Sequence, residues 1–504
     1  MANKPAVSMS LLFRAVSRHA QQRPDAIALQ AAESALTYAQ LAQQLQRAGG
    51  ELRKSGVKAL GLLADNGAAW AVADLSALFA EILLVPLPPF FSAQQLQHAI
   101  RDSGVDAILT DQPERTEALL GGSCRRVASD AFGGLHLVHL TAPSIADVPA
   151  HTAKITYTSG TTGQPKGVCL SLKAMESVAQ SLCDASSASP EDRHLCLLPL
   201  ATLLENIGGI YVPLLAGACS CVLPLRQVGL QGATALDVGQ MLKSVRESRA
   251  STLIMVPQML HALVAALGMG AAKPAQLRFI AVGGAPVSPR LLASAQQLGL
   301  PVYEGYGLSE CASVVALNVP GANKPGSVGK PLPHVKLGFA DDGEIKIGGA
   351  VFSAYLGQAE SPDAEGFWPS GDTGYLDDEG YLHLTGRKKN MFITSFGRNV
   401  APEWVERELT LYPAIAQAAV FGEAQPWNAA VIIPRPLPGV EMQAAVEQAV
   451  AAANQTLPDY ARIKKWILAS EPFTPQNGLL TTNGRLRRNE IWSRYEAEIG
   501  KLYS

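Results

Sequence analysis

The chain has almost no excess of charge of either sign. It carries 41 lysine and arginine residues against 43 aspartate and glutamate residues, so its formal net charge is −2 over 504 residues. Nucleic-acid-binding proteins show clustered basic residues, and the sequence contains no long block of like charges. We therefore expect no nucleic-acid partner.

The chain also lacks a cysteine pattern that would indicate disulfides or a zinc site. Its cysteines are odd in number and no two of them have CxxC spacing. Scattered thiols of this kind are typical of a reducing compartment, which predicts a cytoplasmic protein. The seven cysteines are Cys124, Cys169, Cys183, Cys196, Cys219, Cys221 and Cys311.

No transmembrane segment is expected. The longest uncharged run, residues 207–225, is about long enough to span a membrane. Two prolines and three glycines interrupt it, which predicts a buried helix followed by a strand. Residues 10–29 form an amphipathic, arginine-containing pattern that predicts a docked first helix. A peripheral contact with a membrane surface is the alternative for this segment.

What the sequence does have is alternation of strand and helix patterns. Apolar runs at 60–65, 82–87, 251–257 and 277–284 predict buried strands, and stretches with helical periodicity lie between such runs. This order is typical of an α/β fold with largely parallel sheets.

The pattern changes from about residue 336, where short strands alternate with glycine-containing turns. A chain of this length is expected to form more than one domain. We predict a large N-terminal domain of packed α/β sheets at 1–386 and a smaller, mobile α+β domain at 387–504, with a hinge near 387–390.

Residues 157–168, YTSGTTGQPKGV, combine glycines, hydroxyl side chains and one lysine. Glycines let the backbone approach a ligand closely, and hydroxyl and N–H donors suit a phosphate chain. The stretch is not a Walker loop, because Pro165 rather than glycine precedes Lys166. The sequence therefore predicts a phosphate-binding loop of another kind.

This loop resembles the phosphate-binding signature of the adenylate-forming superfamily, which includes acyl-CoA and aryl-CoA synthetases. Three further motifs follow in the family's order. AVGGAPVS at 281–288 is similar to its adenine loop, YEGYGLSE at 303–310 to its YGxTE motif, and SGDTGYLDDEGYLHLTGRKKN at 370–390 to its ribose-binding and hinge segment. The resemblance covers nearly the whole chain.

The resemblance implies a two-step reaction that uses ATP, Mg²⁺ and coenzyme A. A carboxylate attacks the α-phosphate of ATP to give an acyl-adenylate and pyrophosphate, and a thiol then attacks the activated carbonyl. Neither step needs a protein nucleophile, in agreement with the absence of a GxSxG motif. The protein must supply positioning and neutralisation of charge.

By the same resemblance, Lys166, Glu310 and Arg485 are the expected catalytic residues, and Glu310 is the expected Mg²⁺ ligand. Ser309 would contact the α-phosphate, and Asp372 the ribose. The full set of expected nucleotide-binding residues is Thr158, Ser159, Gly160, Thr161, Thr162, Gly163, Gly284, Ala285, Tyr306, Ser309, Asp372 and Arg387.

Lys389 stands where the family has its hinge residue, and the loop at 394–399, with Gly397 and Arg398, would line the approach of the thiol. The C-terminal segment resembles long-chain fatty acyl-CoA synthetases, and an apolar pocket gains ~0.8 kcal/mol for each buried methylene. The expected substrate is therefore a medium- or long-chain fatty acid.

Two positions depart from the family pattern. Thr202 replaces a common histidine, and Arg485 replaces the adenylation lysine, whose compact charge a planar guanidinium does not reproduce. Two alternatives to an acyl-CoA synthetase therefore stay open. One is a ligase that loads the phosphopantetheine of an acyl carrier protein, and the other is a weakly active or non-enzymatic relative that binds acyl-adenylate.

Overall fold

The first of two large sheets has mainly parallel strands at its centre. A computed structural model describes the chain over residues 10–503 apart from 159–164, 232–234, 286, 288, 359, 397, 437–438 and 482–483. In spatial order the strands of this sheet are β6 (Cys124–Val127), β7 (His136–Leu140), β5 (Ala107–Thr110), β3 (Ala59–Leu63), β4 (Leu83–Pro86), β8 (Thr152–Thr158) and β9 (Lys166–Ser171). Strands β3, β4, β5 and β8 are parallel, and β9 returns antiparallel to β8. The strands expected at 60–65 and 82–87 are thus confirmed as β3 and β4.

The second large sheet has nine strands and carries most of the candidate site. Its order is β18 (Lys330–Pro331), β17 (Ala316–Leu317), β16 (Val302–Tyr306), β15 (Phe279–Val282), β14 (Thr252–Met255), β10 (Arg193–Leu195), β11 (Cys219–Cys221), β1 (Ile27–Gln30) and β2 (Ala35–Thr37). The strands from β16 to β1 are parallel, so their carboxyl ends meet at one edge. Ligands of α/β proteins bind at such an edge.

Helices lie between the two sheets and on their outer faces. The helical segments of the large domain are α1 (Leu11–Gln22), α2 (Tyr38–Ser55), α3 (Ala68–Phe79), α4 (Ala93–Asp102), α5 (Pro113–Leu119), α6 (Leu172–Ala185), α7 (Leu203–Glu205), the π-helix η1 (Asn206–Tyr211), α8 (Val212–Ala216), α9 (Val238–Glu247), α10 (Pro257–Gly268), α11 (Pro289–Gln297) and the 3₁₀ turn η2 (Ser309–Cys311). The largest apolar cluster includes α2, α3, α6 and α8 between the sheets. A second cluster joins α9, α10 and α11 to the other face of the nine-stranded sheet. The helix and strand expected within 207–225 are confirmed as η1, α8 and β11.

The remaining strands form smaller antiparallel and mixed sheets. They are β12 (Leu230–Gln231) with β13 (Ala235–Leu236), β19 (Val335–Phe339), β20 (Glu344–Gly349), β21 (Phe367–Leu376) and β22 (Leu382–Arg387) in one four-stranded sheet, β23 (Phe392–Ile393) with β24 (Asn399–Val400), and the C-terminal sheet β25 (Ile415–Phe421), β26 (Asn428–Pro434) and β27 (Ile463–Leu468).

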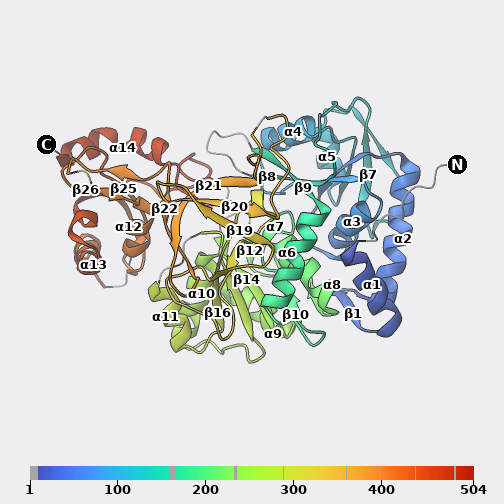
Figure 1. The fold of residues 1–504 in the computed structure, drawn as a ribbon, viewed down its shortest axis with the longest axis horizontal. Coiled ribbons are helices and arrows are strands. Elements are labelled where there is room, and N and C mark those ends of the chain that lie inside the picture. Colours follow the sequence, from blue (N-terminus) through green and yellow to red (C-terminus); the bar gives the residue numbers. More distant parts are fainter. Residues whose placement is uncertain are drawn as a thin grey trace.

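The C-terminal sheet has its own apolar clusters on both faces. Helices α12 (Pro402–Leu409) and α13 (Met442–Thr456) pack on one face, and α14 (Arg488–Tyr503) packs on the other. A short turn, η3 (Asp459–Ala461), connects α13 to β27. Figure 1 shows these orange and red elements beside the blue-to-yellow body of the large domain. The boundary at 386/387 stays a prediction, and these separate clusters support it.

Local sequence signals explain several helix ends. Helix α2 begins at Thr37, whose hydroxyl accepts from the Gln40 N–H while the Gln40 side chain accepts from the Thr37 N–H. It ends at Gly56, which adopts the left-handed conformation with φ 75°. Within the part of the chain that the structure describes, no helix is long and apolar enough to cross a membrane.

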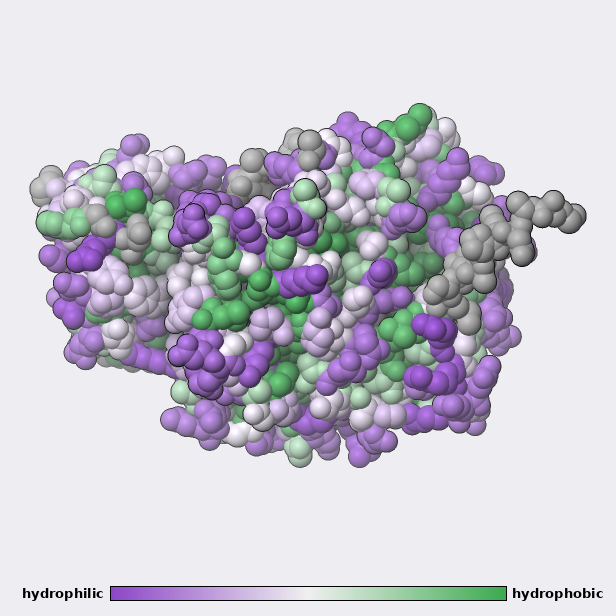
Figure 2. Space-filling model, in the orientation of Figure 1, coloured by the Kyte–Doolittle hydropathy of each residue, from purple (hydrophilic) through white to green (hydrophobic). Residues whose placement is uncertain are grey.

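The surface mixes polar and apolar residues. On the face drawn in Figure 2, hydrophilic residues predominate and smaller apolar groups lie between them. The most exposed large apolar side chains, such as Ile145, Met269 and Phe396, are far apart in the sequence. All seven cysteines are free. The expected cytoplasmic location and the peripheral membrane contact stay predictions.

A buried polar network joins α3 and η1, which lie between the two large sheets, to β8, the strand that precedes the expected phosphate-binding loop. Lys154 on β8 donates to Asp74 of α3 (2.6 Å) and to Asn206 (2.5 Å) and Tyr211 (2.8 Å) of η1. The Tyr211 hydroxyl also donates to Asp74 (2.8 Å). The Lys154 and Asp74 side chains are 1% and 0% exposed, so each charge depends on the other for compensation.

Replacing Lys154 by methionine should lower the free energy of unfolding by ~3–5 kcal/mol, because the buried Asp74 carboxylate would lose its opposite charge. The double variant Lys154→Met with Asp74→Leu should recover much of this loss. Urea denaturation measures both. Lys243→Met is the control, because Lys243 is exposed and its ion pair with Glu247 is long, at 3.9 Å. A loss for Lys154→Met no larger than that of the control would contradict the role of the network.

Candidate active site

A cavity of about 1520 Å³ lies at the carboxyl edge of the nine-stranded sheet and extends between the two parts of the chain. It contains residues from all four sequence motifs. The expected site residues that line it are Thr158, Lys166, Gly284, Ala285, Tyr306, Ser309, Glu310, Arg387 and Arg485. Folding thus brings together residues that are more than 300 positions apart in the sequence.

The part of the site that is expected to bind phosphate begins and ends in a hairpin. Thr158 is the last residue of β8 and Lys166 the first of β9, and the two are paired across the hairpin. The loop residues expected to bind phosphate between them lie outside the described residues; they are Ser159, Gly160, Thr161, Thr162 and Gly163.

Lys166 already has an anionic and an aromatic neighbour. Its Nζ lies 3.4 Å from Glu360 Oε2 and 4.8 Å from the centre of the Tyr355 ring. The lysine side chain is 34% exposed and that of Glu360 is 59% exposed, so this ion pair is weak and a phosphate can replace it. Neither Glu360 nor Tyr355 was expected, because they lie outside the quoted motifs.

Glu310 lies in the short turn η2, which begins shortly after the end of β16. Its Oε1 accepts from the Tyr355 hydroxyl at 2.5 Å, and its backbone oxygen accepts from Phe352 at 2.6 Å. Oε2 has no hydrogen-bond partner among the described residues. A single carboxylate with a free oxygen fits Mg²⁺, which prefers one or two carboxylates together with water and phosphate oxygens.

Asp372 is held by two residues that line the cavity. The Tyr306 hydroxyl donates to Asp372 Oδ2 at 2.7 Å, and Arg387 Nε lies 2.6 Å from Asp372 Oδ1. Asp372 pairs with Arg387 across β21 and β22, so the sheet register itself brings the two side chains together. Burial, and next the Asp372 charge, raise the pKa of Tyr306 well above its usual value. The carboxylate therefore has a fixed orientation beside the cavity, as an acceptor for two hydroxyl groups requires.

The adenine-side loop follows β15. Gly284 has φ 82°, a conformation that favours glycine, and Ala285 follows it at the cavity wall. The Val287 N–H donates to Glu304 Oε1 at 3.2 Å. Burial raises the pKa of Glu304 to about 7. The buried carboxyl group of Glu304, on the neighbouring strand β16, thus fixes the position of the loop that follows β15.

Two cations in the cavity have no ion-pair partner among the described residues. Lys389 and Arg485 line the cavity, and neither side chain forms an ion pair or hydrogen bond with the residues the structure describes. Desolvation inside the cleft, and next repulsion by Arg387, lower the pKa of Lys389 and of Arg485. Arg485 is positioned by a turn in which its N–H donates to Thr481 Oγ1 at 3.0 Å. Unpaired cations of this kind attract an anionic ligand.

One part of the cavity, called the apolar branch below, is lined mainly by apolar residues. It runs along the face of β14 and β15 that carries Ile254 and Ala281, which are paired across the two strands. Val212 and Pro213 of α8 form part of the opposite wall. Gly208 of η1 lets the helix approach this face, because a Cβ there would lie 2.5 Å from Ile254 Cδ1. Thr202, at one of the two departures from the family pattern, also lines the cavity.

The wall beside this branch contains a buried polar cluster that was not expected. His194 Nε2 lies 3.0 Å from Glu205 Oε1, and the Leu198 N–H donates to Glu205 Oε2 at 3.0 Å. His194, Cys196 and Glu205 form the one group of three potential metal ligands found in the described ranges. The hydrogen bonds of these residues within the protein explain why they lie together. The sequence around them has neither the CxxC nor the HExxH pattern that indicates a metal site.

Comparisons with known proteins agree with this geometry. A family model described as AMP-binding enzyme matches residues 16–351, and a model described as AMP-binding enzyme C-terminal domain matches residues 389–504. A long-chain-fatty-acid–CoA ligase of Mycobacterium bovis is 28% identical over 93% of this chain and 92% of its own length. An indoleacetate–CoA ligase of Aromatoleum aromaticum is 30% identical over 83% of this chain and 86% of its own length.

Solved structures show the same architecture. An o-succinylbenzoate coenzyme A synthetase of Bacillus subtilis in complex with ATP and magnesium ion has a TM-score of 0.74 at 25% identity, over 94% of this chain and 98% of that one. An anthranilate CoA ligase in complex with anthranoyl-AMP has a TM-score of 0.82 at 20% identity, over 97% and 98%, and supports the fold alone. The predicted α/β fold with a smaller C-terminal domain is confirmed.

Replacing Arg485 by lysine should keep or raise adenylation, because an ammonium at this position supplies the same charge. Arg485→Met should lower it by ~10²–10³-fold, the loss typical of one preorganised donor in an active site. Carboxylate-dependent pyrophosphate exchange measures both variants. The control is Arg487→Met, two residues away, where the guanidinium contacts Gly478 and Glu490 instead of lining the cavity. A loss of more than tenfold for Arg485→Lys would show that the guanidinium has a role that a lysine cannot take.

Proposed function

Because this chain belongs to the family of AMP-binding enzymes, we propose that it activates a medium- or long-chain aliphatic acid and transfers the acyl group to coenzyme A. The chain is an AMP-forming acid–thiol ligase that uses ATP, Mg²⁺ and CoA. The aliphatic nature of the acid and the roles of the individual residues are the proposal.

The observation that carries it is the continuity of one cavity. The polar part contains Lys166, Tyr306 and Glu310, and the apolar branch along Ile254 and Ala281 opens from it. An acid bound with its chain in the apolar branch has its carboxylate at the phosphate end. Each buried methylene then contributes ~0.8 kcal/mol to binding.

The nucleotide would be oriented by contacts along its whole length. Asp372 accepts from the ribose hydroxyls, Tyr306 and the Gly284–Ala285 loop flank the adenine, and Lys166 holds the β- and γ-phosphates. The ion pair between Lys166 and Glu360 is replaced when phosphate binds. Glu310 would hold Mg²⁺, which neutralises phosphate charge during the transfer.

In the first step a carboxylate oxygen attacks the α-phosphorus and pyrophosphate leaves. Both reactants are anions, so their approach needs positive charge from the protein. Arg485 would contact the carboxylate and the α-phosphate, with Ser309 donating to the same phosphate. Lys389 adds a second cation in the same cavity.

In the second step the thiolate of coenzyme A attacks the acyl carbonyl and AMP leaves. The predicted hinge at 387–390 would turn the C-terminal domain and bring Arg398 toward the thiol, whereas Gly397 lies outside the described residues. Coenzyme A is favoured over a carrier-bound thiol because the similar curated proteins are named as CoA ligases or synthases.

The acid is tested by pyrophosphate exchange with butanoate, octanoate, dodecanoate, hexadecanoate, phenylacetate and a cinnamate, with and without CoA. We expect the aliphatic acids from octanoate upward to give the highest kcat/KM, and AMP release to require CoA. A parallel reaction with a holo-carrier protein should give less product. Aromatic acids that greatly exceed every fatty acid, or a preference for the carrier protein, would contradict the proposal.

The variant Ala281→Phe tests whether the acyl chain of the substrate binds in the apolar branch. Ala281 is partly exposed on the cavity face and lies on β15, before the Gly284–Ala285 loop. The phenyl ring should fill the branch and lower kcat/KM for dodecanoate by more than ~10-fold, while ATP affinity stays unchanged. Ala281→Ser is the control, since it changes polarity with little change of volume. Equal losses for butanoate and dodecanoate would place the chain elsewhere.

A further inference from the structure

The apolar branch continues to the amino ends of the strands. Beyond the Ile254–Ala281 pair, the cavity face presents Thr252 and Phe279, which are paired in the same way, and His194 beside Thr252. All three line the cavity together with Ser186, Ala188 and Asp192 of the loop after α6. This loop forms the far end of the cavity.

The length of the branch can be read from the strand that forms its wall. From Phe279, the first residue of β15, to Gly284, two residues beyond its end, the chain advances five residues, which is roughly 17 Å at the strand rise of ~3.3 Å per residue. An extended alkyl chain with C–C bonds of ~1.5 Å advances ~1.3 Å per carbon, so this span fits about 13 carbons. The far end therefore meets the methyl end of an acid close to dodecanoate or tetradecanoate.

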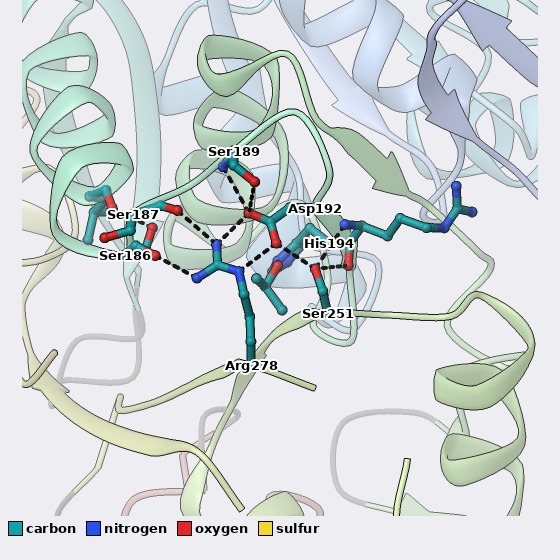
Figure 3. A network of polar contacts seen from close by, with 10 residues as sticks. Ser186, Ser187, Ser189, Asp192, His194, Ser251 and Arg278 are labelled. Carbon is teal, nitrogen blue, oxygen red and sulfur yellow. Dashed lines mark hydrogen bonds and ion pairs between the residues drawn. The ribbon is translucent and has the colours of Figure 1, made fainter. Parts of the chain in front are cut away.

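A single arginine fastens the loop that forms this end. Arg278 Nε lies 2.6 Å from Asp192 Oδ1, and Arg278 Nη2 also contacts Asp192 Oδ2. The same guanidinium donates to the backbone oxygens of Ser186 (2.8 Å) and Ser187 (3.2 Å). Figure 3 shows the arginine reaching across the loop from below, with Asp192 between it and Ser251.

Two further hydrogen bonds hold Asp192 in this loop. Ser251 Oγ donates to Asp192 Oδ1 at 2.7 Å, and the Ser189 N–H donates to Asp192 Oδ2 at 2.9 Å. The Asp192 side chain is 7% exposed, whereas that of Arg278 is 34% exposed. Asp192 thus faces the cavity while part of Arg278 contacts solvent, so the ion pair separates the cavity end from the outside.

We propose that the Arg278–Asp192 ion pair closes the far end of the acyl branch and sets the longest acyl chain that the enzyme accepts. The proposal rests on the proposed function, since it requires the branch to hold the acyl chain. A longer chain would have to displace a buried, fully hydrogen-bonded carboxylate, which is strongly unfavourable. Arg278 and Asp192 are specificity-determining residues, with no contact to the reacting atoms.

Removing the guanidinium should open the end of the branch to solvent. In Arg278→Ala we expect the ratio of kcat/KM for hexadecanoate to that for dodecanoate to rise by more than ~10-fold. One newly accommodated methylene corresponds to about fourfold, the factor equivalent to ~0.8 kcal/mol. The kcat/KM for dodecanoate should stay within about threefold of the parent. Arg278→Lys should give an intermediate ratio, because lysine keeps a charge but not the bidentate contact.

A matched control is Arg126→Ala. Arg126 is 35% exposed and makes a bidentate contact with Glu117, at 2.8 and 3.0 Å, but it does not line the cavity. Its loss should leave the chain-length profile unchanged. Thermal unfolding of each variant shows whether the fold is retained.

A second variant tests the same end without breaking the ion pair. Ala188→Phe should fill the end of the branch and shift the profile toward octanoate, the opposite direction to Arg278→Ala. A uniform loss for all chain lengths in both variants, or an unchanged profile in both, would overturn the proposal while leaving the proposed function intact. A parent enzyme that activates no alkanoate of any length would instead overturn the proposed function, and this inference with it.

Discussion

The carboxylate of Asp372 connects the wall of the candidate site to the segment that leads into the C-terminal domain. It accepts from Tyr306 at the end of β16 and pairs with Arg387 at the end of β22. One charge thus connects the nine-stranded sheet, the four-stranded sheet and the start of the predicted hinge. The three side chains depend on each other, because a carboxylate with 5% residue exposure has few contacts with water and needs partners inside the protein.

Near this carboxylate, the cavity is lined by more cationic side chains than the carboxylate can neutralise. Arg387 is neutralised by Asp372, but Lys389 and Arg485 have no partner among the described residues. Their mutual repulsion is unfavourable in the free protein and is relieved when an anion binds. The cavity therefore suits anionic groups such as phosphate and carboxylate, and in the proposed function its apolar branch holds the remainder of the acid.

Several residues that the sequence singles out line one cavity, because each lies in a short motif near a strand, and their nucleotide contacts stay predictions. Tyr306 and Arg387 are examples, since parallel strand ends and sheet pairing bring them together. The sequence did not predict the contacts between Lys166 and Glu360, which are 194 positions apart, or between Asp192 and Arg278, which are 86 positions apart. Such pairs depend on the order of strands in the sheets, and no local pattern encodes that order. The phosphate loop at 159–164 stays a prediction.

The central claim is that this site joins an aliphatic carboxylate to AMP. The most direct measurement is mass spectrometry of the purified protein after incubation with ATP, Mg²⁺ and dodecanoate in the absence of any thiol. We expect protein-bound dodecanoyl-AMP at close to one equivalent, with an equal amount of pyrophosphate, and loss of the adenylate when CoA is added. Formation of ADP, or the absence of an adenylate with any carboxylate tested, would contradict the claim.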